Sequence, residues 1–262
     1  AHMELKKKRM LTYFIKSAQD IMTAEGMQGI TLRKVADGAG YNNATLYNYF
    51  DDLDHVVLYA CLKYLSLYNN SVAKELKKCH TAKERFYVMW QIFCQISFAH
   101  PDAFHQIFFN KHSSSLTAIY DEYYQLFPEE LPPVEDVLYP ILSDYQLGNR
   151  NLLPLRELLV EEGRPLDELE TISELIISAY HQLLHCCLLE DSRDSAHVPE
   201  YTTKMKHYIS FILFTVSLTD PSLRILFRDW ILLHKNYIYY TKKSFCLSLI
   251  HISEPTRPLY IS

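Results

Sequence analysis

The chain has 262 residues, of which 48% are hydrophobic and only 6 are glycine, a composition that indicates a globular protein able to bury a substantial core. Its formal net charge is −5, which argues against a nucleic-acid partner unless positive charge is concentrated in one region. Hydrophobic residues recur at intervals of three and four with no sustained alternation, so an all-α fold is predicted.

The six cysteines form neither a CxxC pair nor a regular framework, and the sequence carries no recognisable signal peptide or membrane-spanning segment. These features predict a cytoplasmic protein with reduced thiols and no membrane partner.

A first amphipathic helix is predicted over residues 4–24, and it precedes the stretch ITLRKVADGAGYNNATLYNYF at 30–50. Thr31 is expected to cap the first helix of this stretch, because its hydroxyl can accept a hydrogen bond from a backbone N–H. Gly38 and Gly40 permit a turn after that helix. Helix and turn are therefore expected to follow the first helix directly.

A second, shorter helix is expected after the turn, with Asn42 or Asn43 as its cap. It should bury Leu46 and Phe50. The side chains expected to face outward are Thr45, Tyr47 and Asn48. This order of elements is typical of a helix-turn-helix motif, whose second helix enters the DNA major groove.

Periodicity and helix-breaking residues predict the remaining helices in chain order. They are expected at about 51–78, 81–100, 103–110, 115–127, 134–147, 153–162, 167–190 and 200–218. Gly148, Arg150 and Asn151 are expected to separate the helix at 134–147 from the next one. Residues 221–262 have a different texture and are expected to be a tail of non-native origin.

The last two helices carry apolar residues at heptad spacing. The stripe comprises Leu169, Ile172, Ile176, Leu183, Met205, Ile209 and Ile212. Such a stripe is typical of helix pairing, and it predicts a dimer interface. The alternative is that both helices pack these side chains within their own protomer.

The segment ATLYNYF at 44–50, preceded by an Ala-Gly turn at 39 and 40, carries a family signature. Together with the helices around it, over about residues 5–60, it resembles the tetracycline-repressor family of bacterial transcriptional regulators. The resemblance implies a homodimer whose two reading heads dock in successive major grooves of a double-stranded operator, about 34–36 Å apart. It also implies a repressor that a small-molecule effector releases from DNA.

By position, the resemblance assigns DNA contacts to one set of residues. The set is Lys7, Lys8, Thr31, Arg33, Asn42, Asn43, Thr45, Tyr47, Asn48 and Tyr49. The asparagines and Thr45 are expected near base edges or phosphates, since an amide can both donate to and accept from adenine. The tyrosines are expected to serve phosphate contact and packing, and Thr31 and Arg33 are expected at the backbone, with the amino-terminal lysines adding electrostatic attraction. Residues 1–55 contain seven basic and seven acidic residues, so positive charge must be segregated onto one face.

The chain departs from the family just after Phe50, where members usually place a lysine that grips a phosphate. Here three aspartates, Asp51, Asp52 and Asp54, occupy this region. They either weaken non-specific DNA binding or simply cap and complement the start of the next helix.

Aromatic residues gather in the middle of the sequence, where they predict a cavity for an apolar or aromatic effector. The expected lining residues are Tyr87, Trp90, Gln91, Phe98, Phe104, Phe108, Tyr120 and Tyr124. An ordinary aromatic core is the alternative.

No catalytic site, metal site or cofactor is predicted. His181 and His185 lie four residues apart on one helical face, but two ligands do not close a zinc site and no third is evident. Phosphate-binding loops and nucleophile motifs are absent from the sequence.

The predicted organisation is a helix-turn-helix DNA-binding domain at 1–55, a helical effector-binding and dimerisation domain at 56–220, and the tail. The competing hypothesis is an all-α protein that binds a hydrophobic ligand or a partner helix and does not read DNA.

Overall fold

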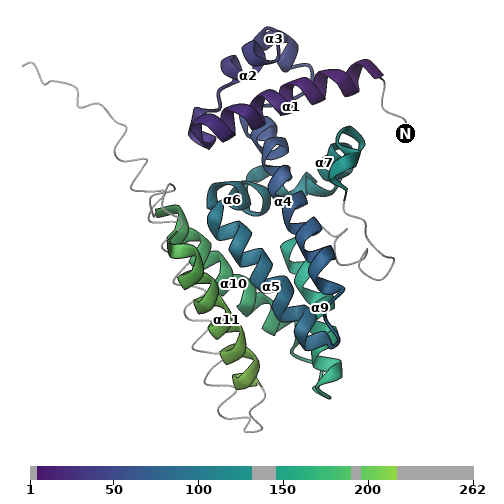
Figure 1. Ribbon diagram of the computed structural model, residues 1–262, viewed down its shortest axis with the longest axis vertical. Helices are drawn as coiled ribbons and strands as arrows, with labels where there is room; N and C mark the ends of the chain where they lie inside the picture. Colours follow the sequence, from purple (N-terminus) through teal and green to yellow (C-terminus); the bar gives the residue numbers. More distant parts are fainter. Residues whose placement is uncertain (1–4, 132–145, 190–195, 217–262) are drawn as a thin grey trace, which may run out of the picture. The chain divides into compact units, whose positions relative to one another are not determined.

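The computed structural model describes residues 5–131, 146–189 and 196–216, and every regular element among them is an α-helix or a short 3-10 turn (Figure 1). The predicted all-α fold is therefore confirmed. Most of the predicted helix at 134–147, and the whole predicted tail at 221–262, lie outside the described residues. The described residues up to 212 form one compact unit. The predicted division at residue 55 stays a prediction.

The amino-terminal part contains α1 (Leu5–Glu25), a 3-10 turn η1 (Met27–Gly29), α2 (Leu32–Gly38) and α3 (Asn43–Leu46). α1 turns its apolar stripe inward, with Leu11, Phe14, Ile15 and Ala18 all buried. α2 packs against α1 and α3 packs against α2, because each short helix is too short to be stable alone.

The central part contains α4 (Leu53–Leu76), α5 (Ala82–Ala99), α6 (Pro101–Phe109), η2 (Lys111–Ser115), α7 (Leu116–Leu126) and η3 (Pro128–Glu130). Local sequence explains several of these boundaries. Asp52 caps α4, and Thr81 and Glu84 form a reciprocal capping box at the start of α5. Pro101 stands in the first turn of α6, where it removes no helical hydrogen bond.

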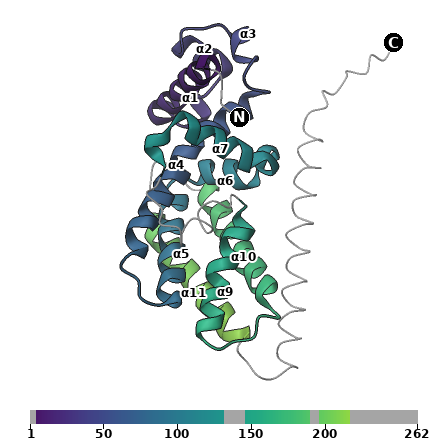
Figure 2. The same cartoon turned by 90° about the vertical axis from the view of Figure 1, so that its right-hand side faces the viewer.

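The last part contains α9 (Leu147–Glu161), α10 (Leu169–Leu189) and α11 (His197–Val216), with α9 and α10 side by side in Figure 2. Among the described helices, α10 is long and apolar enough to cross a membrane by length and composition alone. A helix buried in a protein core can have the same length and composition, so this property alone does not identify a membrane span.

The start of α9 corrects the sequence prediction. Gly148, Arg150 and Asn151 do not break the chain but form the first turns of this helix. The break was predicted because these residues are polar or small. In the structure, Arg150 and Asn151 are buried, and their side chains bond to residues of other helices. Tertiary contacts therefore override the local pattern.

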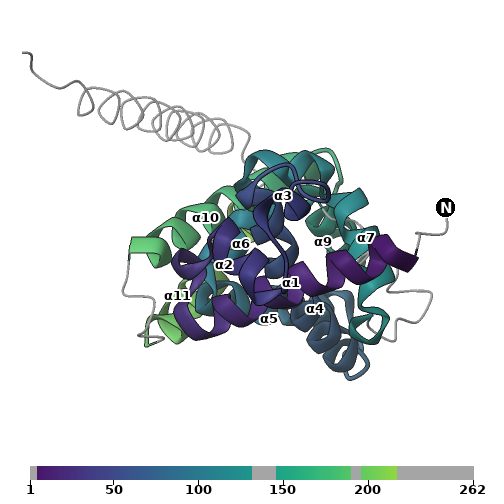
Figure 3. The same ribbon diagram turned by 90° about the horizontal axis from the view of Figure 1, so that it is seen from above.

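α4 organises the unit, since it contacts α1 at one end and α5, α6 and α7 along its length. Figure 1 shows α1, α2 and α3 gathered at one end of α4, and Figure 3 views the three helices from above. α9 contacts both α5 and α10.

The heptad stripe of the last two helices lies largely inside the protomer. The buried members are Ile172, Ile176, Leu183, Met205 and Ile209. Only Leu169 and Ile212 are half-buried. The burial favours the alternative that the pattern left open, namely packing within the protomer. A role of Leu169 and Ile212 in dimerisation stays a prediction.

Candidate nucleic-acid interface

The turn between α2 and α3 depends on two glycines. Gly40 has a φ of 80°, which an L residue with a side chain rarely adopts. A Cβ on Gly38 would lie 2.4 Å from Ser17 Oγ of α1. That hydroxyl is buried and donates to the Val35 carbonyl over 2.9 Å. The glycines thus let α2 lie close to α1 and turn sharply toward α3.

Side-chain caps fix where both short helices begin. Thr31 Oγ1 accepts a hydrogen bond from the Lys34 N–H at 3.2 Å, as predicted. Of the two asparagines considered, Asn42 is the cap of α3, and its Oδ1 accepts from the Thr45 N–H at 2.9 Å. Thr45 Oγ1 donates to the same oxygen at 3.0 Å. Asn42 and Thr45 therefore set the geometry of α3 in addition to any DNA contact.

The outer surface of α3 and of the turn after it carries several of the side chains predicted to contact DNA. Asn43 and Asn48 are exposed, and the ring of Tyr47 is 55% exposed. Tyr49 is half-buried, with its ring centroid 6.1 Å from that of Phe14. The structure thus brings Asn43, Tyr47 and Asn48 together on one surface, whereas Tyr49 points back into the domain.

An aromatic cluster under α3 joins the helix-turn-helix to α1 and α4. The Phe50 ring makes edge contacts with Phe14, His55 and Tyr59, with centroids between 5.6 and 6.1 Å apart. Leu46 and Phe50 are fully buried, as predicted. α3 is therefore held rigidly against the start of α4.

The predicted basic contacts have different surroundings. Lys7 Nζ lies 2.7 Å from Glu122 Oε1 of α7, so its charge is already paired. Lys8 is half-buried, and the strongly exposed Arg33 is 3.7 Å from Asp37. Of these three cations, Arg33 is the most accessible to a phosphate.

The aspartates after Phe50 are engaged by the protein itself. Asp52 Oδ1 accepts from the His55 N–H at 2.9 Å and caps α4, and Lys111 Nζ lies 2.9 Å from Asp52 and 3.1 Å from Asp54. His112 Nε2 lies 3.1 Å from Asp52. Burial alone would raise the pKa of Asp52, but the hydrogen bonds from Lys111, the His55 backbone and His112 outweigh it and hold the pKa well below its usual value.

Sequence reasoning missed Lys111 and His112, which follow α6 far from Asp52 along the chain. A basic residue next to a histidine in a polar loop carried no signal for this contact. Their position helps to distinguish the two roles considered for the aspartates, weakening of non-specific DNA binding and capping of the next helix. Asp52 caps the helix, and Lys111 neutralises charge that would repel DNA.

Polar contacts also tie α1 and α4 to α7. Gln19 Nε2 of α1 donates to the Tyr123 hydroxyl at 3.2 Å, and Tyr59 of α4 donates a hydrogen bond to Glu122. Burial raises the pKa of Tyr59, and the hydrogen bond to Glu122 adds to the effect. The helix-turn-helix region, residues 5–50, which we call the reading head, is therefore held by α7 as well as by α4.

A cavity of about 340 Å³ lies between α5 and α11. Three predicted residues, Tyr87, Trp90 and Gln91, line it. They face Pro199, Thr202, Lys206 and others from α11. Its volume is within the range of small-molecule sites, and its wall combines apolar with polar groups.

The other predicted lining residues do not lie on this cavity. Phe98 stacks on Tyr180, Phe104 packs on Phe93, and Phe108 also contacts Phe93. The hydroxyls of Tyr120 and Tyr124 lie 2.7 Å apart, next to α4. The aromatic residues are thus divided between the cavity wall and the core.

Within the described residues, no group of three or more histidine, cysteine or acidic side chains could hold a metal ion. The His181 ring stacks on Phe109 with centroids 4.0 Å apart. Its surroundings are those of a packed side chain.

The family model described as bacterial regulatory proteins of the tetR family matches residues 14–60, a span that contains α2, α3 and the start of α4. This match confirms the resemblance predicted from ATLYNYF. No curated protein matches the chain.

The chain is also similar to solved structures over part of its length, at low sequence identity. Thermus thermophilus FadR, described as a TetR family transcriptional repressor in complex with lauroyl-CoA, is 15% identical with a TM-score of 0.51, over 80% of this chain and 96% of that one. FadR from Bacillus subtilis in complex with stearoyl-CoA is 12% identical over 76% of this chain and 96% of its own, with a TM-score of 0.46. A putative TetR-family regulator from Mesorhizobium loti is 14% identical over 80% and 98%, with a TM-score of 0.45.

Proposed function

We propose that this chain, which belongs to the tetR family of bacterial regulatory proteins, is a transcriptional repressor that leaves its operator when a small molecule binds to its helical domain. We assign it no catalytic activity, and we place it in the cytoplasm with its DNA. The observation that carries the proposal is the arrangement of α2, the glycine turn and α3, which leaves Asn43, Tyr47 and Asn48 exposed on a rigid support.

The cavity between α5 and α11 is the proposed effector site. Its size suits a small organic molecule, and Trp90 and Tyr87 offer apolar surface beside the polar Gln91. The complex of Thermus thermophilus FadR with lauroyl-CoA supports an effector that has an apolar part, such as an acyl chain.

Release from DNA is proposed to pass through α4, α6 and α7. Lys111 and His112 hold Asp52, the Gln106 amide donates to the Asp54 carbonyl at 3.0 Å, and Glu122 holds Lys7. An effector that shifts α5 or α6 therefore also shifts the start of α4 and changes the spacing of two reading heads. A coupling free energy of about 1–3 kcal/mol reduces operator affinity about 5- to 150-fold.

The test is DNA binding by the purified full chain to fragments from upstream of its own gene, measured by fluorescence anisotropy at fixed salt. We expect sequence-selective binding that Tyr47→Ala weakens about tenfold or more, since one lost contact occurs in both half-sites of the operator. Tyr13→Ala is the matched control, because Tyr13 is 49% exposed but lies on α1 outside α2 and α3. Its affinity should equal that of the wild type.

Equal affinity of Tyr47→Ala and wild type would refute the assignment of α3 as the reading helix. A folded chain that shifts no fragment selectively, even at low salt, would favour the alternative of a ligand-binding protein that does not read DNA.

A further inference from the structure

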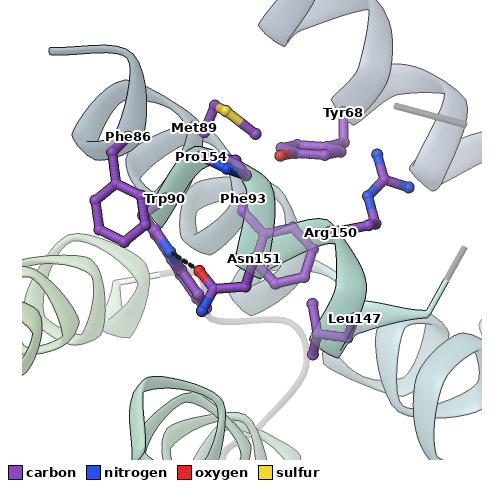
Figure 4. Close-up of a pocket in the computed structure, with 9 residues that line it drawn as sticks. All are labelled: Tyr68, Phe86, Met89, Trp90, Phe93, Leu147, Arg150, Asn151 and Pro154. Atoms are coloured by element: carbon purple, nitrogen blue, oxygen red, sulfur yellow. Dashed lines mark hydrogen bonds between the residues drawn. The ribbon is translucent and has the colours of Figure 1, made fainter. Parts of the chain in front are cut away.

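A second, smaller cavity lies between α4, α5 and α9, and a buried arginine forms part of its wall. Its volume is about 30 Å³. Apolar side chains supply most of the lining, among them Phe86, Met89 and Phe93, while Tyr68 and Arg150 lie beside each other at one side (Figure 4). The guanidinium carbon of Arg150 is 5.3 Å from the centre of the Tyr68 ring.

Arg150 is only 5% exposed, and it uses few of its five N–H donors. Nη2 donates to Asn69 Oδ1 at 2.5 Å. Nη1 is buried without a hydrogen-bond partner. In the part of the chain that the structure describes, no carboxylate lies within ion-pairing distance of the guanidinium. Among the described residues, the desolvated positive charge is therefore balanced by an amide oxygen and an aromatic ring, and by no carboxylate.

A buried charge without a counter-ion is costly, and proteins normally avoid one. Asn69 compensates the charge through its Oδ1 alone, because its amide nitrogen is itself a donor and bonds to the Tyr120 hydroxyl. Arg150 lines the cavity, and its buried Nη1 donor without a partner is thus the feature that an incoming anion would complete.

We propose that Arg150 is the receptor for the carboxylate of an organic acid, whose apolar part packs against the rings around the cavity. The planar guanidinium fork matches a carboxylate in geometry as well as charge. A cavity of about 30 Å³ has room for a carboxylate head but not for a whole effector, so the rest of the ligand extends past the apolar lining. A phosphate is larger and carries more charge into an apolar site.

Contacts of Arg150 and its neighbours reach the helices that hold the reading head. Asn69 lies on α4, and Arg150 bonds to it directly. Next to Arg150, Asn151 Oδ1 accepts from Trp90 Nε1 of α5 at 2.9 Å, and its Nδ2 donates to Ser173 of α10 at 2.8 Å. A carboxylate that draws Arg150 away from Asn69 would therefore loosen α9 from α4. This regulatory role rests on the proposed function, whereas acid binding itself does not.

Acid binding is tested with the full chain by isothermal titration calorimetry, using matched acids and alcohols. The probes are benzoate, hexanoate and decanoate against benzyl alcohol, hexanol and decanol, with phenyl phosphate as a separate arm. We expect at least one acid to bind at least tenfold more tightly than its alcohol. Arg150→Gln removes the charge but keeps an amide donor, and it should weaken that acid about tenfold or more while leaving the alcohol unchanged.

Arg156→Gln is the matched control, since Arg156 is an exposed arginine on the same helix. It should bind the acid like the wild type. If Arg150→Gln does not fold, the comparison of acid and alcohol on the wild type still tests whether binding requires the carboxylate.

Equal affinity for acids and alcohols, an unchanged acid affinity in Arg150→Gln, or no binding of any acid would each overturn the inference. Tighter binding of phenyl phosphate than of benzoate would overturn the choice of a carboxylate. A chain that binds acids through Arg150 but never binds DNA would refute the proposed function alone.

Discussion

Two glycines in this chain differ in backbone conformation, and the difference decides what a methyl group would do at each. Gly40 has a φ of 80° in the turn before α3. Gly148 lies in the first turn of α9, has no positive φ, and has open space around the position of a Cβ. One position needs glycine for its backbone, and the other does not.

Gly40→Ala is expected to lower the free energy of unfolding by about 1 kcal/mol or more, because the left-handed region penalises a Cβ. Gly148→Ala is expected to raise the same free energy by up to about 1 kcal/mol, because alanine has the higher helix propensity. Urea titrations followed by circular dichroism measure both. A stabilising Gly40→Ala would contradict the turn geometry described for residues 38–43.

The predictions that held at single residues concern contacts within a few positions along the chain. Thr31 and Asn42 each cap a helix by accepting a hydrogen bond from the N–H of the residue three positions later. Arg150 behaves differently, since its partner Asn69 is 81 positions away. The periodicity of neighbouring residues carries no signal for such a distant contact. For this reason it predicts a break between helices at Arg150, where the structure has a helix.

At the scale of elements, the start of α4 is a meeting point of titratable groups. The ring of His55 stacks on that of His112 at 5.2 Å, and its Nδ1 lies 3.6 Å from Asp51. Burial lowers the pKa of His55, while the charge of Asp51 opposes the shift. His100, which lies between α5 and α6 and stacks on Tyr64 of α4, also has a pKa lowered by burial.

The lowered pKa values of His55 and His100 both make the folded protein less stable as the pH falls. Below about pH 6.5 the unfolded chain binds protons at these histidines more readily than the folded chain does. Stability is therefore complete above about pH 6.5 and is lost as the pH falls toward the lowered pKa values. We expect the urea midpoint to fall between pH 7.5 and pH 5.5.

His55→Gln should reduce that fall, because glutamine can still accept the Asp51 N–H but does not titrate. Adding His100→Gln should reduce it further, whereas replacing the exposed His207 should not. A pH dependence identical in His55→Gln and wild type would show that burial of this ring does not govern stability.

The elements themselves were largely predictable, because amphipathic periodicity and caps are local properties. α1, α4 and α5 begin and end close to their predicted limits. α9 is the exception, since buried polar contacts with other helices determine its start. For the same reason, the contact of η2 with the start of α4 could not be predicted.

At the scale of the whole molecule, burial changes where an interface between two copies can lie. The heptad stripe predicted one through Ile172 and Ile176, yet both side chains are buried in the protomer. Periodicity shows which residues avoid water, but it does not show which helix covers them. A homodimer built on α10 and α11 must therefore use their outer sides, and Leu189 of α10 is 77% exposed.

We expect the wild type to be a dimer and Leu189→Glu to weaken it without loss of helicity, because a charge would be buried in an apolar contact. Leu67→Glu is the matched control, since Leu67 is a leucine of α4 that is 49% exposed. Ile176→Glu should instead destabilise the protomer by about 2 kcal/mol or more. Light scattering across protein concentrations, with circular dichroism on the same samples, separates the three outcomes. Dissociation of Leu67→Glu with an intact Leu189→Glu dimer would move the interface to α4, and folded monomers of Ile176→Glu would restore the heptad stripe as the interface.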